Sequence, residues 1–111
     1  MQNVAEFEVR GRVGNVTIRE KVAYVSVAVN KNRKDDKGEY QQTTNWIELT
    51  LFGSDIAWAK KLNAGDLITT DGDIQRSKRE QDGEPIYSTD LIVNRRAVLA
   101  KAARDGGQSD D

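Results

Sequence analysis

The sequence predicts an all-β fold with one short helix, and three observations support this. Apolar and polar residues alternate at period two in successive segments, as in half-buried strands. Glycine, asparagine and aspartate gather between several of these segments, where turns are expected. Apolar residues at helical spacing follow directly after the third segment. With 111 residues the chain has room for one domain.

The first two strands are expected in the N-terminal third of the chain. Phe7, Val9 and Val13 share one face of the first strand, and the two glycines in it indicate a bend or bulge. The second strand covers residues 22–30, with alternate valines on one face. Residues 30–42 are rich in Lys, Asp, Asn and Gly, so they predict an exposed loop or hairpin tip.

A third strand over residues 43–52 leads into the short helix. We expect Ser54 or Asp55 as its N-cap, since both side chains can accept a bond from a free backbone amide. Gly65 is placed to end the helix. The packing face of the helix is formed by apolar residues at helical spacing, namely Ile56, Ala59 and Leu62.

The last strands are separated by a strong hairpin signal. The fourth strand runs from Leu67 to about Lys78 and the fifth covers residues 86–93, with an Asp-Gly turn between them. Residues 95–104 predict a basic helix, and residues 105–111 a short acidic flexible tail after a domain of residues 1–104. One helix between the third and fourth of five strands is the order of an OB-fold Greek-key barrel. Another small β-barrel or a sandwich is the alternative.

The third strand carries the main functional signal. Ile47, Leu49 and Leu51 alternate onto one face, so Trp46 and Phe52 share the other face with a glutamate and a threonine. Two large aromatics beside polar groups indicate an open surface, and nucleic-acid bases stack on such rings. The alternative is that either ring is buried under the helix or in a subunit contact.

Basic residues form two clusters that could follow a phosphate backbone. The first cluster contains Lys31, Arg33, Lys34 and Lys37, of which the first three are the predicted DNA contacts, and the second contains Arg76, Lys78 and Arg79. The chain has a formal net charge of −1, and without the three acids of residues 105–111 the remainder has 17 bases and 15 acids. This balance is far from that of a strongly basic nucleic-acid binder, and charged loop tips are often merely solvated.

Composition excludes several kinds of chemistry. Without cysteine or histidine the chain has no disulfide, no zinc–thiolate site and no imidazole base, and we predict no cofactor and no metal. Asp66, Asp71 and Asp73 would be the ligands of a metal-dependent nuclease, but their spacing matches no ligand motif. We therefore expect no catalytic activity. No apolar run is long enough to span a membrane and no signal peptide is visible, which predicts a cytoplasmic protein.

A series of short motifs resembles one family. The motifs, in chain order, are Gly11-Arg12-Val13-Gly14, residues 22–30, Gly38-Glu39-Tyr40, Thr44-Asn45-Trp46, Leu51-Phe52-Gly53, Ala64-Gly65-Asp66-Leu67, Asp71-Gly72, Asp82-Gly83 and Tyr87-Ser88-Thr89. Together they resemble the bacterial single-stranded DNA-binding proteins, over roughly residues 4–94. The resemblance implies an OB-fold in a homo-oligomer, a tetramer or a dimer. It also implies binding of single-stranded DNA without sequence specificity in replication, repair or recombination. Trp46 and Phe52 match the family's stacking aromatics.

The sequence also departs from the family pattern. Asn32 stands where a tryptophan is frequent, a second tryptophan falls on Lys78 or Arg79, and Glu48 occupies a position that is often basic. The acidic tail lacks the family's terminal Pro-Phe, which argues against recruitment of protein partners through it. An OB-fold protein-interaction or accessory module with weakened DNA binding is therefore the alternative function.

Overall fold

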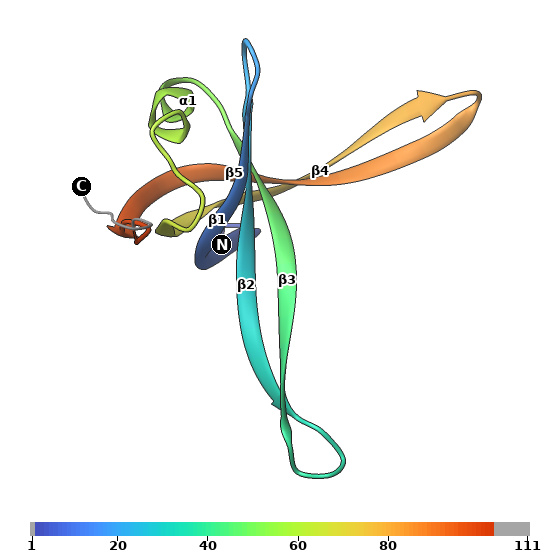
Figure 1. Ribbon diagram of the computed structural model, residues 1–111. Coiled ribbons are helices and arrows are strands. Elements are labelled where there is room, and N and C mark those ends of the chain that lie inside the picture. Colours follow the sequence, from blue (N-terminus) through green and yellow to red (C-terminus); the bar gives the residue numbers. More distant parts are fainter. Residues whose placement is uncertain (1, 104–111) are drawn as a thin grey trace.

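The computed structural model describes residues 2–103, which form a closed five-stranded barrel (Figure 1). The elements in chain order are β1 (Glu6–Ile18), β2 (Ala23–Lys34), β3 (Tyr40–Leu51), α1 (Ser54–Ala59), β4 (Leu67–Gln81) and β5 (Glu84–Ala100). Around the barrel the strands follow the order β1-β2-β3-β5-β4. The helix lies between β3 and β4 in the chain, so the OB-fold prediction is confirmed.

Neighbouring strands pair antiparallel except where the barrel closes. There β3 meets β5 in parallel, with Thr50 opposite Ile92. On the other side β1 pairs with both β2 and β4, so it belongs to two ladders. The Thr70 hydroxyl donates to the Val9 carbonyl at 3.2 Å, across 61 positions of sequence. The barrel is therefore built largely from contacts between distant parts of the chain.

The core is formed by the aliphatic faces that the alternation predicts. Leu49 and Leu51 of β3 are fully buried, and Ile47 is half-buried against the same cluster. Thr50, expected on the wet face, is buried instead, with 5% of its surface exposed. The reason is its place at the β3–β5 closure, where the neighbouring strand covers it.

β4 and β5 approach each other closely at Gly72. The register of the two strands shifts between Asp71 and Gly72, as at a β-bulge. A Cβ atom on Gly72 would collide with the carbonyl oxygen of Ile92 and lie 3.0 Å from the amide of Asn94. Only glycine fits here without backbone movement.

Two hairpins extend beyond the barrel in different directions (Figure 1). We call residues 30–44 the β2–β3 arm and residues 75–90 the β4–β5 arm. Of the two forms predicted for residues 30–42, an exposed loop or a hairpin tip, the structure shows the hairpin, and its ladder continues until Lys34 pairs with Tyr40. The segment is polar because both faces of the arm are exposed to solvent. An arm that lies outside the barrel has no side that packs against the core.

The helix packs as predicted but begins and ends differently. Gly53, with φ 63°, is the N-cap, and no side chain caps the helix. Asp55 is used elsewhere, in an ion pair of 2.7 Å with Arg96 of β5. The helix ends at Ala59, so Gly65 does not terminate it but lies in the turn before β4 with φ 95°. Within the described residues no helix has the length and apolar character needed to cross a membrane.

The basic helix expected over residues 95–104 is not formed. Residues 95–100 belong to β5, where Ala97 pairs with Thr69 and Val98 with Ile68. Pairing with β4 outweighs the helix propensity of this Ala- and Arg-rich segment. Residue 104 and the tail predicted for residues 105–111 lie outside the described residues.

Candidate nucleic-acid interface

Trp46 lies on the outer surface of the β2–β3 ladder, with 63% of its surface exposed. It pairs with Ala28 of β2, and Glu48 pairs with Ser26 on the same face. We call this outer surface of β2 and β3 the stacking face. Phe52 follows directly after β3 and is 47% exposed. Both aromatics predicted from alternation are therefore displayed to solvent and not packed in the core.

The Trp46 ring reaches across β2 to Gly14 of β1. A Cβ atom at position 14 would lie 2.5 Å from Cζ3 of Trp46 and 3.1 Å from the hydroxyl of Ser26. That hydroxyl accepts a hydrogen bond of 2.9 Å from the Asn15 amide, at the register shift between β1 and β2. The lack of a side chain at Gly14 thus leaves room for the six-membered ring of the indole, while Trp46 stays largely exposed.

Tyr40 is an exposed aromatic that the sequence interpretation missed. It begins β3 and is 73% exposed. Residues 40, 46 and 52 have the same parity, so Tyr40 and Trp46 share the stacking face. The six-residue spacing could have revealed it, but the third strand was predicted to begin only at residue 43, so alternation was not extended to Tyr40.

The first basic cluster is divided between the two faces of the β2–β3 arm. Lys34 pairs with Tyr40 and lies on the stacking face, whereas alternation places Lys31 and Arg33 on the opposite face. All three side chains are exposed. The structure therefore brings Lys34 into line with Trp46 and separates the other two from it.

The second basic cluster lies on the β4–β5 arm, which projects away from the first (Figure 1). Arg76 and Lys78 share one face of this arm, and Arg79 lies on the other. The Arg76 guanidinium stacks on the ring of Tyr87 at 4.2 Å, and Tyr87 also pairs with Lys78. The two basic clusters do not form one continuous patch.

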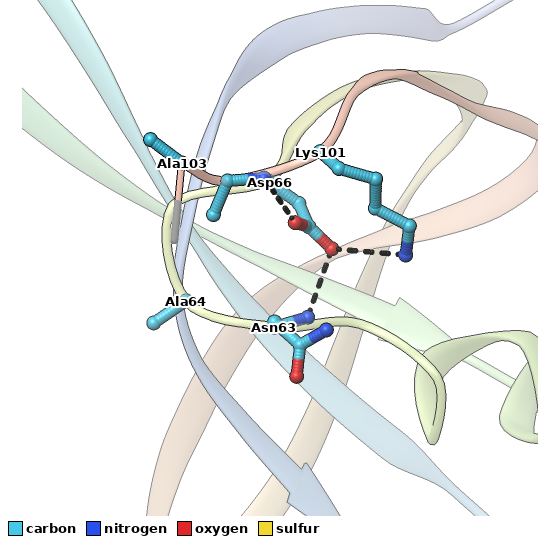
Figure 2. A pocket seen from close by; sticks show the side chains of 6 residues that line it. Asn63, Ala64, Asp66, Lys101 and Ala103 are labelled. Carbon is cyan, nitrogen blue, oxygen red and sulfur yellow. Dashed lines mark hydrogen bonds and ion pairs between the residues drawn. The ribbon is translucent and has the colours of Figure 1, made fainter. Parts of the chain in front are cut away.

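The three carboxylates of the nuclease alternative each have a separate protein partner. Figure 2 shows Asp66 in a pocket of about 410 Å³, where its carboxylate accepts bonds from the amides of Asn63 (2.9 Å) and Ala102 (2.8 Å). Asp71 pairs with Arg95 at 3.0 Å, and Asp73 accepts a bond from the Asn94 side chain at 3.1 Å. In the part of the chain that the structure describes, no three acidic side chains gather into a metal site.

Asp66 fastens the end of β5 to the turn that precedes β4. Burial raises the pKa of its carboxyl, but the amides of Asn63 and Ala102 and the Lys101 ammonium at 3.5 Å favour the charged form. The net effect is a pKa below the ordinary value for aspartate. We call these contacts the Asp66 clasp. It gives this carboxylate a structural role.

Comparison with known proteins places the chain in a family. The sequence matches the single-strand binding protein family over residues 8–99, which is most of its length. The chain belongs to this family. It is similar to the single-stranded DNA-binding protein of Xanthomonas campestris, with 33% identity over 81 residues, 70% of this chain and 46% of that protein. The corresponding protein of Streptococcus mutans is 32% identical over 93 residues, 79% of this chain and 54% of that protein.

Solved structures of the single-strand binding family share the fold. The SSB of Plasmodium falciparum, solved in complex with ssDNA, superposes with a TM-score of 0.69 at 22% identity and covers 89% of this chain and 97% of its own. A small single-stranded DNA-binding protein from Streptomyces coelicolor gives a TM-score of 0.62 at 15% identity, over 87% and 95% of the two chains. The chain spans about half the length of the curated relatives it matches.

Proposed function

We propose that this protein binds single-stranded DNA without sequence specificity, by stacking bases on Trp46 and Phe52. The observation that carries the proposal is Trp46, which is 63% exposed and whose ring lies beside Gly14. Every base has a π-face, so an open ring of this kind accepts any of them. The family match and the relatives named for DNA binding support the same function.

Positive side chains that could contact phosphates lie on the arms more than on the barrel. Glu48 lies on the stacking face two residues from Trp46, so phosphates are repelled there. Lys34 on the same face and Arg76 with Lys78 on the other arm supply the positive charge. We infer that stacking dominates near Trp46 and that phosphate contacts are made mainly along the arms.

Trp46→Ala should weaken binding of an oligo-dT strand by about 1–3 kcal/mol for each base that leaves the ring. Stability should change little, because the removed ring fills no core cavity. Fluorescence anisotropy of a labelled oligonucleotide measures the affinity, and thermal unfolding measures the stability. Trp46→Phe, which keeps a ring, is the matched control and should retain most of the affinity.

Tryptophan fluorescence of the wild-type protein should be quenched on binding, because a base stacks on Trp46. The change can be assigned to Trp46, since the other tryptophan is a poor stacking site. Trp58 is half-buried, with the Arg96 guanidinium 5.4 Å from its ring centre. The logarithm of affinity should also fall with the logarithm of salt, by about 0.7 for each phosphate neutralised. Binding that is equally strong in Trp46→Ala would contradict the proposed site. A wild-type protein that binds no oligo-dT would instead favour an OB-fold module that binds proteins.

We further propose that the protein acts as a homo-oligomer in replication, repair or recombination, in the cytoplasm and without a catalytic step. Exposed apolar side chains outside the stacking face are available for subunit contacts, among them Val4, Ile18 and Leu99. Light scattering should give a multiple of the 12.4 kDa chain mass. A monomeric mass at micromolar concentration would refute the oligomer without affecting the proposed stacking site.

A further inference from the structure

The stacking face continues along the β2–β3 arm to its end. The register between β2 and β3 is unbroken from Ala23 with Leu51 to Lys34 with Tyr40. Side chains at even positions of β3 therefore keep to one face over the whole length of the strand. Tyr40 and Trp46 lie roughly 20 Å apart along this face, at about 3.3 Å per residue.

The strip between Tyr40 and Trp46 is polar and open. It contains Asn30, paired with Thr44, and Asn32, paired with Gln42. The Thr44 hydroxyl and the Asn30 side chain form a hydrogen bond of 2.6 Å across the ladder. All four residues are exposed, and neither an acidic nor a large side chain interrupts the strip. A flexible polyanion can lie along such a surface.

Tyr40 itself has the features of a base platform. The residue is 73% exposed, more than Trp46. The Lys34 ammonium lies 5.9 Å from the ring centre, within the range of a cation–π contact. An ammonium over one side of a ring leaves the other side free, and it adds a positive charge beside the ring.

The turn at the tip of the arm holds Tyr40 in position. The Asp35 carboxylate accepts bonds from the amides of Lys37 (2.9 Å) and Glu39 (2.8 Å). Its second oxygen accepts a bond from the Gln41 side chain at 3.3 Å. The residues on both sides of Tyr40 are thus tied to one carboxylate. The pKa of Asp35 is lowered, chiefly by the Glu39 amide, so the group that orders this turn is ionised at neutral pH.

We propose that Tyr40 is a third stacking platform, with Lys34 as its phosphate partner, and that bound DNA extends from the barrel along the β2–β3 arm. This inference rests on the proposed function. It also gives the arm an aromatic contact with DNA, which Asn32 cannot provide because it has no ring. A base on Tyr40 and a base on Trp46 then belong to one strand of DNA that follows the polar strip between them.

The test compares two lengths of oligo-dT, because OB-folds bind about 4–16 nucleotides. Tyr40→Ala should weaken binding of a strand of about 16 nucleotides roughly tenfold. It should leave the affinity for a strand of about 4 nucleotides unchanged when that affinity is measured by Trp46 quenching. The quenching reports only a strand bound at Trp46, and such a strand is too short to reach Tyr40. Tyr40→Phe should restore the affinity for the long strand. Lys34→Gln should lower the salt slope for the long strand by about 0.7.

Thr43→Ala is the matched control, since Thr43 is exposed on the opposite face of the same strand, away from the polar strip. Unchanged affinity of Tyr40→Ala for the long strand would overturn the inference, as would an equal loss in the control. A fall in the mass by light scattering with unchanged DNA affinity would assign Tyr40 to a subunit contact and likewise overturn it. If the wild-type protein binds neither strand, the proposed function fails first, so the two failures are distinguishable.

Discussion

Gly72→Ala should lower the free energy of unfolding by about 3 kcal/mol, the upper part of the range for overpacked sites. The added methyl group would collide with the Ile92 carbonyl, which is backbone and cannot rotate away. Ile92 is also the residue through which β5 meets β3, so moving it loosens the closure of the barrel. Urea unfolding followed by circular dichroism measures the change.

Gly14→Ala is the matched control for this substitution. Its new methyl group would meet the Trp46 ring and the Ser26 hydroxyl, which are side chains that can shift. We expect a smaller loss of stability and a changed Trp46 fluorescence. If both variants lose the same stability, the close backbone approach at Gly72 is not the limiting contact.

Asp66→Ala should have the second large effect on stability. The substitution removes two part-buried hydrogen bonds from the Asn63 and Ala102 amides to a charged acceptor, at about 1.5–3 kcal/mol for each bond. The Lys101 ion pair adds little to this, because the lysine side chain is 63% exposed and its charge is screened by solvent. Differential scanning calorimetry at neutral pH should show a clearly lower melting temperature. A melting temperature within a degree of wild type would show that the Asp66 clasp does not stabilise the barrel.

The Asp66 clasp also predicts how stability depends on pH. Because the pKa of Asp66 is lowered by folding, its contribution is complete above the ordinary pKa of about 4 and is lost as the pH falls through the folded value. Asp66→Asn should therefore be less stable than wild type at neutral pH, and the difference should shrink in acid. Asp35→Asn is the comparison, since that carboxyl orders only the tip of an arm. A constant difference at all pH values would contradict the assignment.

Features that depend on local alternation could be predicted from the sequence. The opposite placement of Trp46 and Leu49 follows from the two-residue period of a strand, and the structure confirms it. The order of five strands with one helix likewise follows from periodicity and turn residues, and it favoured the OB-fold barrel over another small β-barrel or a sandwich.

Features that depend on distant partners could not be predicted in this way. Residues 95–100 have the composition of a helix, yet they form a strand because they pair with β4, and no local sequence pattern indicates that pairing. Thr50 looks like a solvent-facing residue until β5 closes over it. Tyr40 was missed for a related reason, since an arm with polar residues on both faces lacks the alternation by which strands are recognised.

The pairing of β1 with β4 has a consequence for the order of events during synthesis. A ribosome adds about 5–20 residues per second, so the 61 positions that separate Val9 from Thr70 take roughly 3–12 s to appear. The β2–β3 hairpin can form within about 1–10 μs of its emergence. The hairpin is complete at Leu51, 19 positions before Thr70, so for about 1–4 s the nascent chain carries a folded hairpin and a β1 strand with one edge unpaired. Neighbouring chains on the same messenger could add to that edge, and the arrival of β4 ends this exposure.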